Sequence, residues 1–383
     1  MLKEPKKIGK VALMHYYLNQ CGGAEKVLEV LMEMFPEAPI YTLFYDEKKT
    51  RGYFAGKVKK TSFLDFEFVR SHHRAFIPLL PLASSSLKLN DSYDLVISSS
   101  AGYGKGFNCN KAFHICYCHT PLRYAWEKDY IQKMDFFRFP ILQTLVEPIR
   151  LALKSWDKKT SGHVNVFIAN SRFTAQKINK FYNREAEVIY PPIDTKTFFP
   201  EPEKTRKSGK KEKNSGYFLM VGRLLHYKRF DLTIQAFNEL KLPLKIVGEG
   251  PDFQKLKSMA KSPLIEFCSF VESLDDLRRL YSNARALIFP QIEDFGMVAA
   301  EAQACGAPVI GYNAGGFKEI ILDGKTGLFF NEQTPEALIK TINAFNNMKF
   351  SKKEIVKNAQ RFSEDNFKLN FGKIIKKYKN SVI

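Results

Sequence analysis

Short apolar runs alternate with amphipathic stretches along most of the chain, a pattern that predicts parallel strands joined by helices. The first run, residues 8–14, leads into a polar loop and then into residues 24–35, where apolar residues recur at helical spacing. Each predicted strand of the first half ends in small or polar residues, as strands do where they open onto a ligand crevice. The later strands of this half are predicted at residues 95–98, 113–118 and 164–169.

A second series of the same kind begins near residue 190. Its strands are predicted at residues 217–221, 244–247, 265–267, 286–289 and 308–311. Between the two series lie a proline-rich segment, residues 190–202, and a basic loop, residues 204–213, which together mark a linker. We therefore expect an α/β protein of two Rossmann-like domains, with boundaries 1–190 and 191–365. A basic C-terminal helix, residues 366–383, is expected to pack back towards the first domain.

Length and charge narrow the class of protein. A chain of 383 residues with 45% hydrophobic residues is long enough for two globular domains. The net charge of +19 indicates an anionic partner, which is a nucleic acid, an acidic lipid or a phosphorylated substrate. The basic residues are spread out and no nucleic-acid recognition motif is present, so we expect no nucleic acid. No apolar run approaches the roughly 18 residues of a membrane span, and residues 11–14 are too short for a signal peptide, so we expect a cytoplasmic protein.

The six cysteines are scattered in apolar surroundings, which is typical of free thiols in a reducing compartment. Cys116 and Cys118 form a Cys-x-Cys motif with His114 and His119 close by. A zinc site of this type needs a second pair of ligands, and the sequence offers none elsewhere. We therefore predict no metal at this motif.

The segment of residues 290–316 contains the most informative candidate binding residues. A predicted strand ends before it, and a predicted helix begins near residue 298, so the helix N-terminus points into the crevice and can bind a diphosphate. Glu301, one turn into that helix, can accept two hydrogen bonds from a ribose diol, and Glu293 can bind the hydroxyls of a second polyol. These residues together predict a nucleotide-sugar site, in which the backbone of the helix start supplies the N–H groups of Gly296, Met297 and Val298.

Three further motifs follow predicted strands. Arg223 and Lys228 come after the first strand of the second series and can neutralise a departing diphosphate. Gly248 and Glu249 form a turn after the next strand, which is a weak signal by itself. Gly22 and Gly23 stand at the first strand–helix turn, where glycine lets the backbone approach a ligand. The full G-x-G-x-x-G pattern is missing there, which disfavours a dinucleotide-dependent dehydrogenase.

Residues 290–316 and 221–231 resemble the signatures of retaining glycosyltransferase family 4, with two glutamates separated by seven residues. The resemblance extends from Gly22 to about Phe330 and implies the GT-B fold, in which two Rossmann-like domains face each other across a cleft. It implies that the first domain binds the acceptor and the second the donor. It further implies that Glu301 binds the donor ribose, Glu293 contacts the transferred hexose, and Arg223 and Lys228 bind the pyrophosphate. The remaining donor contacts implied are Gly22, Gly23, Gly248, Glu249, Phe295, Gly296, Met297 and Val298.

The motif His119-Thr120-Pro121-Leu122-Arg123-Tyr124, at the end of a predicted strand, resembles a subset of the family that includes bacterial mannosyltransferases of O-antigen (lipopolysaccharide) and capsule assembly. This resemblance implies that His119 lies over the transferred sugar, with Arg123 and Tyr124 on the sugar or acceptor side. It favours transfer of mannose from GDP-mannose, with retention, to a glycan or polyprenyl-diphosphate-linked acceptor. The catalytic residues implied are His119, Arg223, Lys228 and Glu293.

Three alternatives stay open at this stage. The donor can instead be UDP-glucose, UDP-N-acetylglucosamine or UDP-galactose, and a nucleotide-sugar epimerase on the same fold is a further rival. The most distant alternative is a basic nucleic-acid-binding protein.

No Asp-x-Asp motif lies in a suitable loop, so we expect no cofactor and no essential metal ion. Residues 68–89 mix basic and large apolar residues, which predicts either a peripheral contact with the anionic inner face of the cell membrane or a buried helix beside the acceptor cleft.

Overall fold

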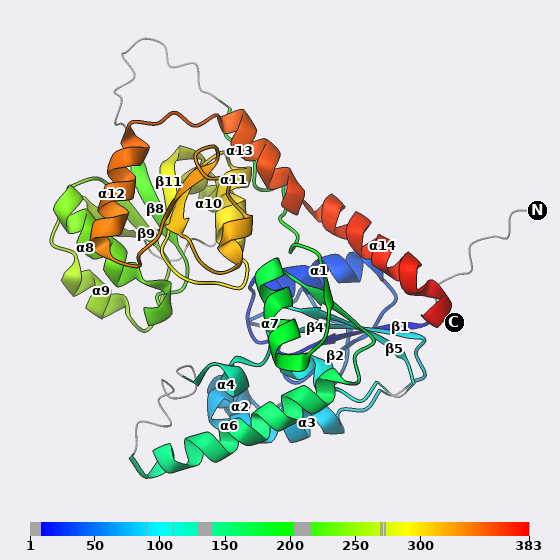
Figure 1. The fold of residues 1–383 in the computed structure, drawn as a ribbon. Helices are drawn as coiled ribbons and strands as arrows, with labels where there is room; N and C mark the ends of the chain where they lie inside the picture. Colours follow the sequence, from blue (N-terminus) through cyan, green and yellow to red (C-terminus); the bar gives the residue numbers. More distant parts are fainter. Residues whose placement is uncertain are drawn as a thin grey trace, which may run out of the picture. The chain divides into compact units, whose positions relative to one another are not determined.

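The computed structural model describes residues 9–89, 91–109, 111–128, 140–202, 216–268, 271 and 273–382. The basic loop predicted at residues 204–213 lies outside this set. The chain divides into two compact units: an N-terminal unit of Met1–Pro191 and Phe367–Ile383, and a C-terminal unit of Pro192–Asn366. Each unit contains one parallel sheet flanked by helices, so the expectation of two Rossmann-like domains is confirmed (Figure 1).

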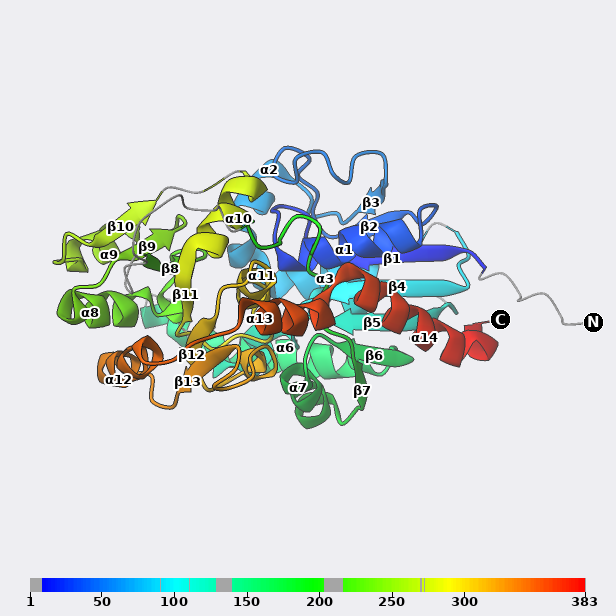
Figure 2. The same cartoon turned by 90° about the horizontal axis from the view of Figure 1, so that it is seen from above.

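The sheet of the N-terminal unit has seven parallel strands in the order β3-β2-β1-β4-β5-β6-β7 (Figure 2). The central strands β4 and β5 are almost wholly buried, as expected for parallel strands covered by helices on both faces. The strands β2, β3 and β7 are three or four residues long, and the apolar pattern did not predict them. The bounds are β1 Val11–His15, β2 Ile40–Thr42, β3 Val58–Thr61, β4 Leu95–Ser100, β5 Phe113–Cys118, β6 Val166–Ala169 and β7 Ala186–Val188.

Two apolar clusters cover the two faces of this sheet, because successive residues of a strand point to opposite faces. Ala12 and Met14 of β1 belong to the cluster that includes residues of α3 and α6. Leu13 belongs to the other, which includes residues of α1 and, from the C-terminal helix α14, Phe367 and Phe371. The helical elements are α1 Gly23–Met34, α2 Glu67–His72, η1 His73–Leu79, α3 Leu80–Ser86, η2 Tyr103–Gly106, α4 Arg123–Trp126, α6 Pro140–Ser161, α7 Arg172–Tyr182 and α14 Glu364–Val382.

The sheet of the C-terminal unit has six parallel strands in the order β10-β9-β8-β11-β12-β13. Phe218 and Met220 of β8 pack in a cluster with residues of α8 and α12. The opposite face carries α10, α11 and α13 (Figure 1). The strand bounds are β8 Tyr217–Val221, β9 Leu244–Val247, β10 Ile265–Cys268, β11 Ala284–Phe289, β12 Val309–Tyr312 and β13 Gly327–Phe330. The helical elements are η4 His226–Lys228, α8 Phe230–Leu240, α9 Phe253–Met259, α10 Leu274–Asn283, α11 Met297–Ala304, η5 Gly316–Glu319, α12 Pro335–Asn346, α13 Lys352–Ala359 and η6 Gln360–Phe362.

The basic, helical C-terminal stretch that the sequence predicts over residues 352–382 is divided in the structure. A short 3-10 turn, η6, separates α13 from α14, and Ser363 stands between them in extended conformation. Among the described residues, no helix is both long enough and apolar enough to cross a membrane.

Candidate functional site

Both sheets reverse their strand order at one place, between β1 and β4 in the N-terminal unit and between β8 and β11 in the C-terminal unit. Ligands of open α/β sheets bind outside the carboxyl ends of the strands at such a reversal. The loop after β8 holds Arg223 and Lys228, and the loop after β11 holds Glu293. The C-terminal unit therefore places three predicted donor residues at its reversal point.

The helix α11 begins directly after this loop, and a glycine sets its start. Gly296 is the N-cap residue with φ +112°, a backbone conformation that residues with a side chain rarely adopt. A Cβ atom at this position would lie 2.9 Å from the ring of Phe289. No side chain caps the helix, so its first backbone N–H groups are positioned to bind an anion. Met297 and Val298, two of the predicted diphosphate contacts, are the first residues of α11.

The loop of residues 293–295 is held by the glycine turn that follows β12. The backbone N–H of Gly316 donates to the carbonyl of Glu293 at 2.8 Å. A Cβ on Gly316 would lie 2.0 Å from the carbonyl oxygen of Asp294, and one on Gly315 would lie 2.5 Å from that of Glu293. The two loops can touch only because both positions are glycine. Phe295, a predicted donor contact, is buried in the same loop and packs on Phe362.

The structure brings Lys228 and Glu293 together as an ion pair between Nζ and Oε1. Their side chains are 13% and 19% exposed, so the pair remains accessible to solvent. Gln291, which is buried, donates from Nε2 to the same carboxylate oxygen at 3.3 Å. Arg223 is exposed in the same loop as Lys228 and forms no ion pair within the described part of the chain. Both cations are expected near a diphosphate from the sequence, but neither the pairing of Lys228 with Glu293 nor the contact from Gln291 was predicted.

Glu301 lies one turn into α11, as predicted, and accepts a hydrogen bond from the Tyr281 hydroxyl at 3.1 Å. Tyr281, in the last turn of α10, is fully buried. Burial, reinforced by the charge of Glu301, raises the pKa of Tyr281 well above its usual value, so the phenol remains a donor. This contact could not be predicted, because a tyrosine on the apolar face of a helix cannot be distinguished from a core residue by sequence.

The turn of Gly248 and Glu249 lies against the loop that carries Arg223. Gly248 has φ +142°, and a Cβ there would lie 2.1 Å from the carbonyl oxygen of Gly222. The carbonyl of Glu249 accepts a hydrogen bond from the backbone N–H of Leu224 at 2.8 Å, and the side chain of Glu249 is exposed. Packing of one loop on the other accounts for this glycine, and the predicted contact of this turn with the donor stays a prediction.

In the N-terminal unit, His119 directly follows β5 and is held at three points. Its Nε2 lies 2.8 Å from the Ser99 Oγ at the end of β4, its backbone N–H donates to the Ser100 carbonyl, and its own carbonyl accepts from the Asn170 side chain at 3.0 Å. Ser99 was not singled out from the sequence, although the run of three serines at a strand end is the signal that identifies it. Arg123 and Tyr124 are half-buried at the start of α4.

A buried network supports the segment that follows His119. Asp157 of α6 accepts from Trp126 Nε1 and from the Tyr182 hydroxyl, each at 2.7 Å. It also pairs with the ammonium group of Lys105, and the side chains of Lys105 and Asp157 are 1% and 0% exposed. The network joins η2, α4, α6 and α7, so it fixes the helical turn that contains Arg123 and Tyr124.

Gly22 and Gly23 lie at the start of α1, where Gly22 is extended with φ −154°. Any residue can adopt this conformation, so the backbone itself does not require glycine. A Cβ on Gly22 would lie 3.0 Å from the Glu25 carboxylate, which is buried beside His15 with 3.5 Å between Oε1 and Nε2. The structure therefore gives a packing reason for Gly22, and the predicted contact of this turn with the donor stays a prediction.

The Cys-x-Cys motif lies within β5. Cys116 and Cys118 are both buried, and burial raises the pKa of the Cys116 thiol to about 11. The Nε2 atom of His114 and the Ser98 hydroxyl share a hydrogen bond of 2.7 Å. Across the described ranges, no group of three or more His, Cys, Asp or Glu side chains is arranged to hold a metal ion.

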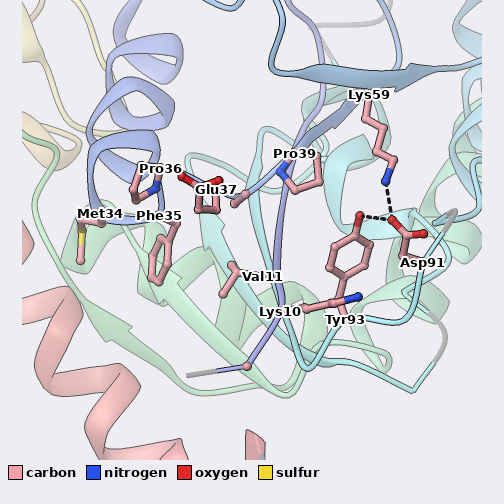
Figure 3. A pocket seen from close by; sticks show the side chains of 12 residues that line it. Lys10, Val11, Met34, Phe35, Pro36, Glu37, Pro39, Lys59, Asp91 and Tyr93 are labelled. Atoms are coloured by element: carbon pink, nitrogen blue, oxygen red, sulfur yellow. Dashed lines mark hydrogen bonds and ion pairs between the residues drawn. The ribbon is translucent and has the colours of Figure 1, made fainter. Parts of the chain in front are cut away.

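A pocket of about 1000 Å³ lies at the opposite, amino-terminal end of β1 (Figure 3). Lys59 and Tyr93 both interact with Asp91 on one side of it, and apolar residues such as Met34 and Phe35 line the other. None of the predicted site residues lines this pocket. The candidate site is therefore defined by the loops at the carboxyl ends of the strands.

Comparison with solved structures identifies the fold. The structure of the Anabaena protein HepE in complex with UDP and glucose superposes with a TM-score of 0.66 at 17% sequence identity, over 96% of this chain and 99% of that one. This likeness, together with the two Rossmann-like units, shows that the fold is GT-B.

Sequence comparison supports one class of protein. Residues 201–362 match the family model described as "Glycosyl transferases group 1". An uncharacterized glycosyltransferase of Methanocaldococcus jannaschii is 25% identical over 210 residues, which are 54% of this chain and 57% of that protein. A GDP-mannose-dependent alpha-(1-6)-phosphatidylinositol monomannoside mannosyltransferase of Mycolicibacterium smegmatis is 28% identical over 206 residues, 48% of this chain and 54% of that protein.

The chain thus spans about half the length of the curated relatives it matches. These matches support a glycosyltransferase of the group 1 type. The donor-side candidates from Arg223 to Glu301 lie inside the segment that matches the family model, whereas His119, Arg123 and Tyr124 lie outside it.

Proposed function

We propose that this chain is a retaining glycosyltransferase that moves mannose from GDP-mannose to a glycan or polyprenyl-diphosphate-linked acceptor in cell-surface polysaccharide or glycolipid assembly. The observation that carries the proposal is the uncapped N-terminus of α11, which lies between Glu293 and Glu301 in the sequence. An anion site between two carboxylates suits a nucleoside diphosphate sugar, whose diphosphate lies between two groups that carry hydroxyls. The GDP-mannose-dependent relative of Mycolicibacterium smegmatis supports the choice of donor.

In the proposed reaction, a bond forms between an acceptor hydroxyl oxygen and the anomeric carbon of mannose. The bond from that carbon to the phosphate oxygen breaks on the same face of the sugar, and the leaving phosphate takes the hydroxyl proton. Arg223, Lys228 and the start of α11 stabilise the charge that develops on the diphosphate. Glu293 and His119 orient the hexose. No step requires a metal ion.

In this scheme, the first event is that the donor separates the ion pair between Lys228 and Glu293. Both groups are accessible, so a bound donor can offer each a better partner: the diphosphate for Lys228 and sugar hydroxyls for Glu293. Donor binding therefore replaces one ion pair with two charged contacts. Until the donor arrives, the ion pair keeps both side chains close to the positions in which they would bind it.

The same geometry allows a UDP-sugar as the alternative donor, because the residues described hold a diphosphate, a ribose and a hexose but no base. Thermal unfolding in the presence of GDP, UDP, ADP and their sugars, without added metal, separates the two. Binding to the native state raises the melting temperature by mass action, so a selective rise with GDP and GDP-mannose supports mannose. A rise with UDP compounds alone replaces the donor, and no rise with any nucleotide overturns the donor site.

We further propose that residues 68–89, with the exposed Phe63 and Phe66 just before them, bind an anionic membrane surface. Phe66 and Phe68 are 62% and 66% exposed, and Phe63, Leu79 and Leu82 are also exposed. Arg74 and His72 are exposed in the same segment. Large apolar side chains next to basic ones suit the interface of an anionic bilayer, and the net charge of +19 adds attraction at long range. Val69, Ile77 and Leu80 are buried and hold the segment on the N-terminal unit.

Flotation with vesicles of anionic and of neutral lipid at low salt tests the membrane proposal. The double variant Phe66→Ser with Phe68→Ser is expected to lose most of its binding to anionic vesicles. The matched control is Leu264→Ser, which removes an exposed apolar side chain from the C-terminal unit and is expected to bind as the unmodified chain does. Binding that is absent without substitution, or equal in all variants, contradicts the proposal.

A further inference from the structure

Tyr281 connects α10 to the residue proposed to bind the donor ribose. Its hydroxyl donates to Glu301 Oε2 at 3.1 Å, and its ring is fully buried. We infer that Tyr281 is a positioning residue for recognition of a ribonucleoside diphosphate, acting through the carboxylate of Glu301. This inference rests on the proposed function, because it requires Glu301 to bind the ribose diol.

A buried phenol needs a hydrogen-bond partner, and a carboxylate is the strongest acceptor that a protein offers. The bond to Tyr281 fixes one carboxylate oxygen and with it the plane of the Glu301 carboxylate. Two vicinal hydroxyls can donate to a carboxylate together only when that plane faces them. Without this contact, the Glu301 side chain would lose conformational entropy when the ligand binds. With it, the side chain is already ordered in the folded protein, so ligand binding does not carry that cost.

The tyrosine itself is held from several sides within the C-terminal unit. Its ring packs edge-on against Phe198, with 5.9 Å between the centroids. Arg278, on the same helix, pairs with Glu201 at 3.2 Å and lies over the ring of Phe199. Residues 198–201 therefore clamp the end of α10, and the hydroxyl cannot leave Glu301 without disturbing this packing.

The ligand feature recognised is the vicinal diol of ribose, which GDP and UDP share. The inference therefore holds whichever base the donor carries, and nucleotides that lack the 2′-hydroxyl provide a direct probe. In this scheme Tyr281→Phe keeps the ring and its packing, removes the hydrogen bond to Glu301, and weakens only ligands that carry both hydroxyls.

The test is calorimetric binding of GDP, 2′-deoxy-GDP, UDP and 2′-deoxy-UDP to the full chain. The matched control is Tyr217→Phe, which also removes a hydroxyl bond to α10, at 2.9 Å to the Leu280 carbonyl, but does not contact Glu301. Tyr281→Phe is expected to weaken the ribonucleotide that binds by about five- to tenfold and to leave its deoxy form nearly unchanged. Tyr217→Phe is expected to preserve the preference for ribose.

Turnover with the donor adds a second measurement: KM rises in Tyr281→Phe while kcat changes less than about twofold, since the ribose is remote from the bond that breaks. The double variant Tyr281→Phe with Glu301→Gln is expected to bind no more weakly than Glu301→Gln alone, because the two residues act as one unit. Undiminished preference for ribose in Tyr281→Phe, or equal weakening of ribose and deoxyribose forms, overturns the inference. Failure of every nucleotide to bind the unmodified chain overturns the proposed function instead, and the inference with it.

Discussion

Two lysine–carboxylate pairs, one in each unit, differ mainly in their burial. Lys105 and Asp157 of the N-terminal unit are 1% and 0% exposed, and Asp157 accepts two further hydrogen bonds. Lys228 and Glu293 of the C-terminal unit are 13% and 19% exposed. A buried pair cannot exchange partners without leaving a charge unpaired, whereas an accessible pair can. We infer that burial separates an ion pair that stabilises the fold from one that can exchange its partner for a ligand.

The largest expected effect comes from breaking the buried pair. Asp157→Ala leaves Lys105 charged and unpaired in the core, so the free energy of unfolding of the N-terminal unit is expected to fall by about 3–5 kcal/mol. The two tryptophans of the chain, Trp126 and Trp156, both belong to this unit, so urea unfolding followed by their fluorescence reports on it alone. Lys158→Ala, an exposed neighbour on α6, is the control and is expected to change stability by less than about 0.5 kcal/mol. If Asp157→Ala lowers the free energy of unfolding by less than about 1 kcal/mol, the pair does not stabilise the fold.

Breaking the accessible pair is expected to reduce activity and leave stability nearly unchanged. Glu293→Ala removes the contact proposed for the hexose, so kcat/KM for sugar transfer is expected to fall about 100-fold or more. The pair is only partly buried and its side chains keep contact with solvent, so the unfolding free energy is expected to change by about 1 kcal/mol. Glu239→Ala, an exposed glutamate on α8, serves as the control. Turnover close to that of the unmodified chain would remove the role assigned to Glu293.

A pH titration extends the comparison, because the central strand β5 of the N-terminal sheet contains a buried histidine, His114. Burial, and then the charge of Lys105, lower the pKa of His114 to about 3. The unfolded chain, with a histidine pKa of about 6.5, binds this proton at higher pH than the folded chain does. Stability therefore falls as the pH falls below about 6.5, and the loss from this residue reaches about 2 kcal/mol at about pH 5.

The measurement is urea unfolding by tryptophan fluorescence at about pH 7.5 and pH 5, compared with His114→Gln. The variant is less stable at the higher pH, because it disturbs the contact with Ser98, but it is expected to lose less stability between the two pH values. Equal losses in both proteins would assign the pH dependence to other groups.

The smallest expected effect concerns the hydrogen bond that orients His119. Ser99→Ala removes the contact with Nε2, so kcat is expected to fall about tenfold if His119 orients the hexose, with little change in stability. Ser99→Thr, which keeps a hydroxyl, is expected to restore most of the activity, and Ser155→Ala on α6 is the neutral control. An unchanged kcat and an unchanged pH profile in Ser99→Ala would separate Ser99 from the reaction.

The sequence predicted the fold class because long apolar runs such as Phe113–Cys118 become buried central strands. Short edge strands escaped detection: β7 is three half-buried residues with no distinctive pattern. In the site, Glu293, Glu301 and Lys228 could be found because their spacing around a strand end and a helix start is itself a signal. Tyr281 could not be found in this way, because it acts through Glu301, a neighbour in space that lies on another helix.

The discontinuity of the N-terminal unit has a consequence for biosynthesis. Phe367, Phe371 and Ile375 of α14 complete the apolar cluster under α1, yet they follow the whole C-terminal unit in the chain. During translation, the ribosome therefore releases residues 192–366 before the first-made sheet receives its last covering helix. Until then the nascent polypeptide exposes an apolar face, and exposed apolar surface favours aggregation. A stop codon shortly before residue 367 would leave that face permanently uncovered.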